Sequence, residues 1–508
     1  MSELLDNPTN ELTNEPTKIN KLILNPSQQK AVNALKKFIA SNNNKFLLLG
    51  PGGSGKTTCI VNALDGNNEY KIAFCAFTNK ATQVLKNTAE RFGLKFQADF
   101  MTIHKLLMLE PKYFERESEV SFSFDVNKLV GYSQYDIIIF DECSVISKEL
   151  KTYIYEAQRY ALFAHQKANK HIFIGDFWQL PPVGEEKSLI FEASIKEKWP
   201  VSKLDKVMRS GNDVIYEVNN SLLNWISKFK APKEHADELD NFHKKFPYNL
   251  LAKNSIGGKY INSLDIFLDE YIELWKTQPS IVILTYSHSS CNKTNWAIQD
   301  RIDLEAQRPI PENRDEIKFY VGDRCCVDKP IEVCEIEKRT IDNIEYVTLG
   351  NPSGESLYNG EIFDIIMAQD VRIITPLNKF SYITKYFNGQ LLKVHRINDP
   401  TKIYDILYID DTVINAARGR IRSHERRMFY LNVFSQFIRY YPKLTYGYCL
   451  TVYKSQGSEW NTVLINLISI RYCTIGLTIP DLKKKTALFK TAYTAISRAS
   501  HNLYLLWR

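Results

Sequence analysis

The loop GPGGSGKT at residues 50–57 constrains the fold of this chain more than any other short stretch. It follows the apolar run FLLL and precedes the helix-like stretch TCIVNAL. The pattern G-x-x-x-x-G-K-[ST] is typical of a strand–loop–helix unit whose backbone N–H groups surround phosphate oxygens. Lys56 is expected to reach the β- and γ-phosphates, and Thr57 a magnesium ion. A glycine-rich turn with an accidental Lys-Thr is the alternative, and the flanking strand and helix make it the weaker one.

Further apolar runs recur along the chain, each followed by a polar turn and a helical pattern. They lie at 46–49, 72–77, 137–140 and 172–174 in one series, and at 281–284, 462–466 and 503–507 in another. Such alternation predicts parallel strands joined by crossover helices, with ligands at the C-terminal edge of each sheet. We therefore expect an α/β protein with two parallel-sheet modules.

The segments between these runs predict two insertions and a tail. Residues 330–440 contain aromatic and charged β-type stretches such as EYVTL and QLLKVHRI, which predict a β-rich insertion. Residues 108–134, with SFSF between charged stretches, predict a small β-hairpin. The expected boundaries are a disordered tail at 1–20, a first module at 21–200, and a second module at 201–329 and 441–508.

Composition narrows the class of protein without identifying it. The 508 residues are 44% hydrophobic and 24% charged, which is ordinary for a soluble globular protein. The net charge of +7 permits a polyanionic partner without requiring one. No apolar run approaches the roughly 20 residues that span a bilayer. The nine cysteines form no C-x-x-C pair, which favours a reduced intracellular (cytoplasmic) protein without structural zinc.

Two further strand ends carry groups suited to phosphate chemistry. Asp141 and Glu142 follow the run IIIF, where Asp141 suits a magnesium shell and Glu142 suits orienting or deprotonating the attacking water. Acidic residues after a strand are also common as helix caps. Gln179 lies in IFIGDFWQLPPVGE, on a loop stiffened by Pro181 and Pro182. Gln179 can contact both the γ-phosphate and the attacking water. The alternative interpretation of this loop is a polar turn.

Taken together, the motifs resemble superfamily 1B helicases, the RecD/Dda-like branch, chiefly through the form GDFWQLPPV. The matches run from about residue 22 to 506 in the family's order. They are LNPSQQKAV (the adenine-reading Q motif), AFTNKATQVLK (motif Ia), TIHKLL (motif Ib), KLDKVMRS, TYSHSSCNKTN, LTVYKSQGSEW (motif V) and TAYTAISRAS (motif VI). The resemblance implies two RecA-like domains, 1A and 2A, around an ATP cleft. The hairpin then corresponds to domain 1B and the β-rich insertion to an SH3-like domain 2B.

The resemblance also implies which residues act on ATP and on a nucleic-acid strand. The catalytic set is Lys56, Asp141, Glu142, Gln179, Arg209 and Arg498. The ATP-binding set adds Gln28, Gly50, Pro51, Gly52, Gly53, Ser54, Gly55, Thr57, Thr58, Gly457 and Glu459. The strand-binding set is Thr78, Asn79, Thr102, His104, Thr285, Thr451 and Tyr453. Since Arg209 and Arg498 are arginine fingers in the family, and a finger is worth about 10³ to 10⁵ in rate, hydrolysis is expected to need cleft closure.

Three features leave alternatives open. Tyr453 stands where the family has histidine in T-x-H-K-[SA]-Q-G, and a tyrosine stacks and donates but does not titrate near neutrality. Phe122 and Phe124 are candidates for the wedge at a duplex junction, although aromatics that alternate in a strand more often face a core. The basic run at 418–427 either touches the DNA backbone or forms a solvated helix face.

The sequence therefore predicts an ATP- and Mg²⁺-dependent DNA helicase that moves on single-stranded DNA, with the 5′-to-3′ direction taken from the resemblance. Its expected partners are single-stranded DNA, DNA forks, and replication or recombination proteins, and it is expected to act as a monomer. A superfamily 1 helicase for RNA, or for both RNA and DNA, is one alternative. A nucleic-acid-binding remodelling subunit with a vestigial ATPase is another, and the complete catalytic set argues against it.

Overall fold

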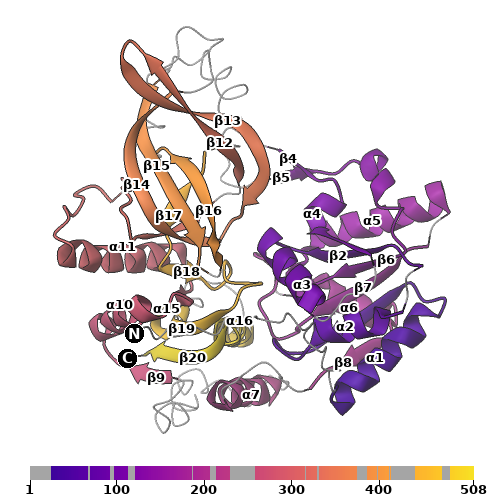
Figure 1. Ribbon diagram of the computed structural model, residues 1–508. Helices are drawn as coiled ribbons and strands as arrows, with labels where there is room; N and C mark the ends of the chain where they lie inside the picture. Colours follow the sequence, from indigo (N-terminus) through magenta and orange to yellow (C-terminus); the bar gives the residue numbers. More distant parts are fainter. Residues whose placement is uncertain are drawn as a thin grey trace, which may run out of the picture.

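The computed structural model of the chain describes residues 24–66, 69–91, 97–112, 121–166, 168–185, 187–205, 213–228, 258–314, 316–328, 331–374, 386–397, 399–410, 412, 441–471 and 481–507. These residues form two α/β lobes and a β-rich sheet that stands on the second lobe (Figure 1). Within the described ranges, no helix is long and apolar enough to cross a membrane.

The first lobe is built on a six-stranded parallel sheet. Its strands, in spatial order, are β3 (Ala98–Thr102), β2 (Ile72–Ala76), β6 (Ile137–Phe140), β7 (Lys170–Gly175), β1 (Lys45–Leu49) and β8 (Val201–Lys203). Its helices are α1 (Pro26–Ile39), α2 (Lys56–Leu64), α3 (Asn79–Arg91), the short α4 (Ile103–Leu106), α5 (Lys148–His165) and α6 (Leu189–Lys196), with 3-10 turns η1 (Val126–Gly131) and η2 (Cys143–Val145).

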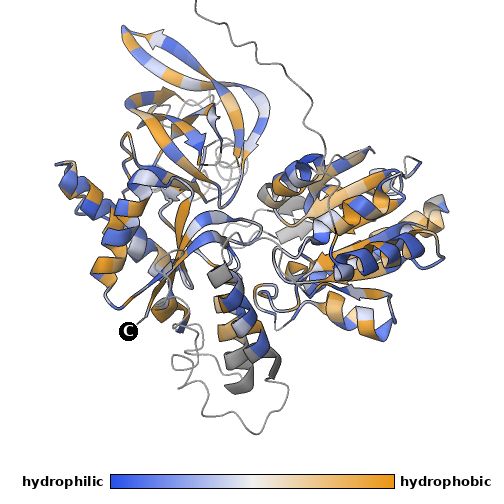
Figure 2. Ribbon diagram, turned by 60° about the horizontal axis from the view of Figure 1, so that its bottom comes forward, coloured by the Kyte–Doolittle hydropathy of each residue, from blue (hydrophilic) through white to orange (hydrophobic). Residues whose placement is uncertain are grey.

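Both faces of this sheet are covered, which explains the continuous apolar runs of its strands. Within β1, Leu47 joins one hydrophobic cluster, while Phe46 and Leu48 join the cluster on the other face. In Figure 2 the helices around the sheet carry both hydrophobic and hydrophilic residues along their length, as helices with one buried face do. The runs at 46–49, 72–77, 137–140 and 172–174 are β1, β2, β6 and β7.

The second lobe repeats this architecture with a five-stranded parallel sheet. Its strands, in spatial order, are β18 (Cys449–Thr451), β10 (Ile281–Thr285), β19 (Trp460–Asn466), β20 (Ala499–Leu506) and β9 (Gly258–Ile261). Its helices are α7 (Asp213–Lys228), α10 (Leu264–Thr277), α11 (His288–Glu305), α15 (Leu467–Arg471) and α16 (Asp481–Ile496). The prediction of two parallel α/β modules is confirmed.

The β-rich insertion is a seven-stranded, mainly antiparallel sheet. Its strands are β12 (Ile331–Ile341), β13 (Ile344–Leu357), β14 (Ile362–Ile374), β15 (Tyr386–Arg396), β16 (Asp399–Tyr408), β11 (Arg324–Val327) and β17 (Leu444–Tyr446). The β12–β13 hairpin turns at Asp342 and Asn343, both with positive φ (50° and 62°), as a two-residue hairpin turn requires. The last two strands of the series, β11 and β17, lie outside the expected range 330–440 and carry the chain from the second lobe into the sheet and back.

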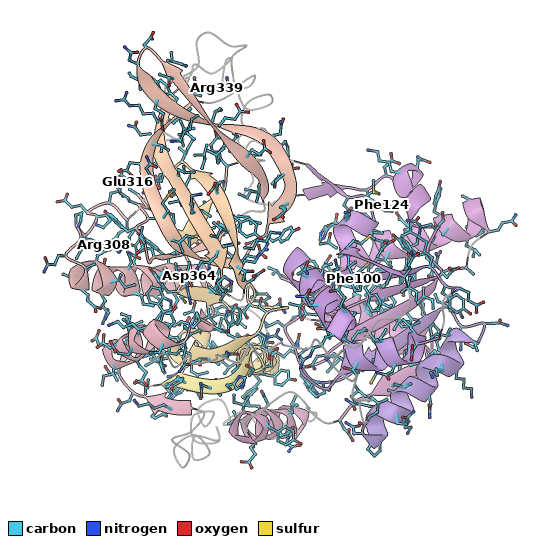
Figure 3. The ribbon with its side chains drawn as sticks, in the orientation of Figure 1. Phe100, Phe124, Arg308, Glu316, Arg339 and Asp364 are labelled. Carbon is cyan, nitrogen blue, oxygen red and sulfur yellow. The ribbon has the colours of Figure 1, made fainter. Side chains whose placement is uncertain are left out.

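The β-rich sheet and the second lobe share one core. A single hydrophobic cluster contains Phe267 of α10, Ile283 of β10 and Phe363 of β14. Arg324, fully buried at the start of β11, donates to Asp364 of β14 (2.7 Å) and to the backbone oxygens of Ile281 (3.0 Å) and Pro279 (2.9 Å). Figure 3 labels Asp364 at this base of the sheet. The sheet is therefore anchored to the second lobe by apolar packing and by a buried arginine.

A small antiparallel pair, β4 (Glu110–Lys112) and β5 (Ser121–Ser123), lies within the segment 108–134 that predicted a hairpin. Phe122 pairs with Pro111 in this ladder. Phe124 follows the pair, and its ring stacks on Tyr153 of α5 with centroids 4.5 Å apart (labelled in Figure 3). Its ring thus packs against the core of the first lobe, which is the alternative that alternating aromatics suggest.

Candidate active site

The loop between β1 and α2 has the geometry of a phosphate cradle. Gly53 and Gly55 both have positive φ (73° and 84°), so that successive N–H groups of the loop can turn inward. Gly55 is the N-cap of α2, and the first N–H groups of this helix receive no side-chain cap. Lys56 Nζ folds back over the loop and donates to the backbone oxygens of Gly50 (2.8 Å) and Pro51 (2.9 Å). An anion at this helix N-terminus would therefore meet available donors.

The Q motif packs directly behind this loop. Gln28 closes a capping box with Asn25 at the start of α1, and its Nε2 donates to Ser54 O (3.0 Å). A Cβ on Gly55 would lie 2.5 Å from that same amide, so only glycine fits. The buried hydroxyl of Ser54 has no hydrogen-bond partner among the described residues. Of the two threonines after Lys56, Thr57 is half-buried at the mouth of the loop and Thr58 is buried in α2.

The two carboxylates after β6 lie at the same edge of the sheet as this loop, with β7 between β6 and β1. Asp141 N donates to Cys75 O of β2 (2.8 Å), and Asp141 Oδ1 accepts from Glu142 N (2.9 Å). Glu142 has φ of 52°, a left-handed conformation that costs about 1 kcal/mol or more for a side chain with a Cβ. Such strain is often found at functional sites. With Thr57, Asp141 offers the hard oxygen ligands that Mg²⁺ prefers.

The loop after β7 carries Gln179 and a buried carboxylate that the sequence analysis did not single out, Asp176. A Cβ on Gly52 would lie 3.9 Å from Gln179 Nε2, so the buried amide of Gln179 reaches the phosphate loop. Asp176 accepts from Trp178 N (3.0 Å) and from the hydroxyl of Tyr493 on α16 (2.7 Å). Burial raises the pKa of Asp176, while Lys56 and the Tyr493 hydrogen bond oppose that rise.

Arg498 approaches the site from the second lobe, just after α16. Its guanidinium is buried and donates to the backbone oxygens of Thr494 (3.1 Å) and Ser458 (3.3 Å) and to Ser497 Oγ (3.1 Å). A Cβ on Gly52 would lie 3.6 Å from Ser497 Cβ, so the residue before Arg498 abuts the phosphate loop of the first lobe. Glu459, half-buried, directly follows Ser458. The two lobes therefore meet at the place where a bound triphosphate would lie.

Motif V touches the first lobe at Gly457. A Cβ on Gly457, which has φ of 74°, would lie 2.9 Å from Ala81 Cβ of α3 and 3.7 Å from Glu142 Oε2. This loop of the second lobe thus packs against both helix α3 and the candidate catalytic carboxylate of Glu142. Lys454 of the same loop forms an ion pair with Asp328 at the end of β11. Motif V is thereby linked to the ATP site and to the β-rich sheet.

The contacts described above bring together the phosphate loop, the Q motif, Glu142, Gln179 and the segments of motifs V and VI. Arg209 lies in 206–212, outside the described residues, as does the basic run at 418–427. Sequence reasoning missed Asp176 and its partner Tyr493, 317 positions apart. A signal was present, because Asp176 is a second acidic residue directly after a buried strand.

The candidates for binding a nucleic-acid strand lie at the C-terminal ends of β-strands in both lobes. In the first lobe, Thr78 Oγ1 accepts from Ala81 N (3.1 Å) and Thr102 Oγ1 from Lys105 N (3.1 Å), so both also act as helix caps. Asn79 begins α3. His104 is half-buried, and burial lowers its pKa, which keeps the imidazole neutral near pH 7. Its ring lies edge-on to exposed Phe77 with centroids 5.5 Å apart.

In the second lobe the candidates are more enclosed. Thr285 and Thr451 are paired neighbours on β10 and β18, and both are buried. Thr451 Oγ1 accepts from Lys454 N (3.3 Å), and Thr285 Oγ1 accepts from Cys449 Sγ at 3.6 Å. Tyr453 packs, half-buried, against the main hydrophobic cluster of the second lobe. Direct contact of these hydroxyls with a nucleic-acid strand therefore requires a shift of the loop after β18.

Comparison with known proteins gives one match to part of the chain and several to almost all of it. A family model described as AAA domain matches residues 23–224. An uncharacterized protein of Acanthamoeba polyphaga mimivirus is 28% identical over 530 residues, which cover 95% of this chain and 99% of that protein. A solved structure of two coordinating Pif1 helicases at forked dsDNA has 14% identity and a TM-score of 0.47, covering 95% of this chain and 92% of that chain. The Pif1 helicase from Bacteroides in complex with ADP-AlF3 and ssDNA has 16% identity and a TM-score of 0.44, with the same coverage.

Proposed function

We propose that this protein is an ATP-dependent helicase that moves along single-stranded DNA in the 5′-to-3′ direction and unwinds duplex DNA ahead of it. One observation supports the proposal most strongly: the phosphate loop of the first lobe abuts the segment of the second lobe that carries Arg498. A site divided between two lobes makes hydrolysis depend on how the lobes are placed.

Binding of ATP would exchange the internal partners of Lys56 for phosphate oxygens. Its ammonium now bonds two loop carbonyls, and a triphosphate in the cradle offers stronger, charge-assisted acceptors. A magnesium ion held by Thr57 and Asp141 would neutralise charge on the β- and γ-phosphates. Glu142 would orient the attacking water, and Gln179 would contact the water and the γ-phosphate. Arg498, with Arg209, would stabilise the charge that develops in the transition state.

Opening and closing of the cleft would convert hydrolysis into movement. Closed lobes place Arg498 beside the phosphate loop, and loss of the γ-phosphate removes the charge that favours closure. Each lobe has small polar residues at strand ends, Thr78 and Thr102 on one side and Thr451 on the other, and Thr102 and Thr451 are buried in this structure. Such groups can bind phosphates without sequence preference. Alternating grip by the two lobes would then move the protein along the strand.

The test begins with ATP turnover measured with and without single-stranded DNA. We expect DNA to stimulate turnover, and Lys56→Ala to abolish turnover while DNA affinity is largely kept. Unwinding is then compared on matched DNA and RNA duplexes with either a 5′ or a 3′ single-stranded tail. The proposal predicts unwinding of DNA with a 5′ tail.

Other outcomes separate the alternatives. Unwinding of RNA duplexes at an equal rate would replace the DNA helicase with a dual helicase, and unwinding from a 3′ tail would reverse the direction. Absence of turnover in the unaltered protein would favour a remodelling subunit with a vestigial ATPase. Unchanged turnover in Lys56→Ala would reject the site itself.

A further inference from the structure

Lys490 is a buried lysine of α16 that the proposed chemistry does not use. Only 6% of its surface is exposed, although lysine is rarely buried. Its Nζ lies 4.9 Å from the ring centroid of Phe177, which belongs to the loop after β7 in the first lobe. Within the described residues, neither a hydrogen bond nor an ion pair reaches this ammonium. A positive charge of the second lobe is thus covered by an aromatic side chain of the first.

Lys490 belongs to a seam between the loop after β7 and helix α16. The seam contains two hydrogen bonds, from the Tyr493 hydroxyl to Asp176 (2.7 Å) and from Leu180 N to Thr494 Oγ1 (3.1 Å). Leu180 also packs into the main hydrophobic cluster of the second lobe. The loop carries Gln179 and the helix leads to Arg498, so the seam joins the two elements that carry these catalytic candidates.

Burial of the ammonium costs free energy when the seam forms. Burial removes most of the water around this ammonium, and a cation–π contact with Phe177 offsets only part of that loss. Asp176 is the described charged group whose field reaches Lys490, and the described acid on the neighbouring helix α7, Glu217, is exposed. Burial outweighs Asp176 and lowers the pKa of Lys490 to about 8. Lys490 therefore holds its proton less tightly when the lobes are closed than when they are open and the lysine is in water.

We propose that Lys490 is a positioning residue that promotes reopening of the cleft, because each closure buries its ammonium under Phe177 and each opening returns it to water. This inference rests on the proposed function, since it concerns the release of the hydrolysed nucleotide. The charge weakens the closed state enough for ADP to leave. Loss of the charge holds the lobes closed on ADP.

The sign of the pH dependence follows from the lowered pKa. Closed lobes bind fewer protons than open lobes between about pH 8 and 10.5, so rising pH favours closure. Between pH 7 and pH 9 this linkage amounts to about tenfold in the closure equilibrium. The experiment measures the affinity for a fluorescent ADP analogue and the kcat and KM for ATP across this range, with single-stranded DNA present.

Three proteins are compared: the unaltered chain, Lys490→Met and Lys490→Arg. Lys490→Met, which cannot be charged, should bind the ADP analogue at least about tenfold more tightly at pH 7, with kcat and KM for ATP falling together. The unaltered protein should gain affinity by about tenfold from pH 7 to pH 9, relative to Lys490→Met. Lys490→Arg, charged throughout, should match the unaltered protein at pH 7 and lack the gain. Lys490→Met should also unfold at an equal or higher temperature, because a desolvated charge is removed.

The inference is overturned if Lys490→Met binds the analogue as the unaltered protein does at every pH, or if Lys490→Arg shows the same gain with pH. Failure of the proposed function looks different, because the unaltered protein would then hydrolyse no ATP. Lys196→Met is the matched surface control, since this lysine side chain is 78% exposed. It should leave affinity and kinetics unchanged.

Discussion

The second lobe makes two junctions of opposite character. Its junction with the β-rich sheet is a shared hydrophobic core, reinforced by the buried guanidinium of Arg324. Its junction with the first lobe combines polar contacts, such as Tyr493 with Asp176, with apolar contacts of Leu180 and Trp178. Apolar cores resist separation, whereas polar seams can open because water replaces their partners. We therefore expect the sheet to move with the second lobe and the molecule to open at the cleft.

Removal of the buried arginine should have the largest effect, and it should act on stability. Arg324→Met leaves the Asp364 carboxylate and two backbone oxygens without their donor. We expect the free energy of unfolding of the second lobe and sheet to fall by about 3 kcal/mol. Urea unfolding followed by tryptophan fluorescence measures this loss.

Arg339→Met is the matched control, since Arg339 is 53% exposed at the far end of the sheet and its ion-pair partner among the described residues is Glu337 (Figure 3). It should cost less than about 1 kcal/mol. Equal losses for the two variants would show that Arg324 does not anchor the sheet.

An added methyl group at the cleft should instead act on turnover. Gly457→Ala places a Cβ 2.9 Å from Ala81 Cβ and forces a side chain into positive φ. Overpacking of this kind costs about 1–3 kcal/mol, and it is paid only when the lobes close. We expect kcat for ATP to fall about tenfold, as measured by steady-state hydrolysis with saturating single-stranded DNA.

Gly354→Ala shares the backbone strain but not the crowding. Gly354 has φ of 79° in the β-rich sheet, and a Cβ there would meet nothing within 4 Å. It should reduce stability by about 1 kcal/mol and leave kcat unchanged. A similar drop in kcat for both variants would contradict a specific role for the Gly457 contact.

The smallest expected effect is at the seam. Tyr493→Phe removes the hydroxyl that donates to Asp176 across the cleft, and kcat should fall about fivefold, since a typical hydrogen bond contributes about 1 kcal/mol net. Tyr446→Phe is the control, because its hydroxyl donates to Lys318 O within the rigid junction (3.2 Å). That variant should change stability and not turnover. If Tyr446→Phe lowered turnover and Tyr493→Phe changed only stability, the roles of the two junctions would be exchanged.

The sheets of both lobes could be predicted because their strands are buried on both faces. Runs such as IIIF at 137–140 carry that burial in their composition, and the turns after them carry the chemistry. The extent of the β-rich sheet was harder to predict, because β11 and β17 are short strands that read as part of the second lobe.

The seam could not be predicted from local patterns at all. Lys490 reads as a surface lysine of a polar helix, and only the placement of Phe177 over its ammonium reveals a buried charge. The role of Phe124 could not be predicted from local patterns either, since its stacking on Tyr153 depends on the position of α5. Tertiary contacts decide these roles, across the cleft for Lys490 and within the first lobe for Phe124, and sequence spacing carries little information about them.

The most direct measurement of the central claim is ATP turnover by Arg498→Ala, together with binding of a fluorescent ATP analogue. If the triphosphate lies between the phosphate loop and Arg498, turnover with single-stranded DNA should fall by about 10³-fold or more while the analogue still binds. Arg498→Lys should restore little of the loss, because lysine lacks the planar fork of arginine. Hydrolysis by Arg498→Ala at the rate of the unaltered protein would show that the second lobe takes no part in the chemistry.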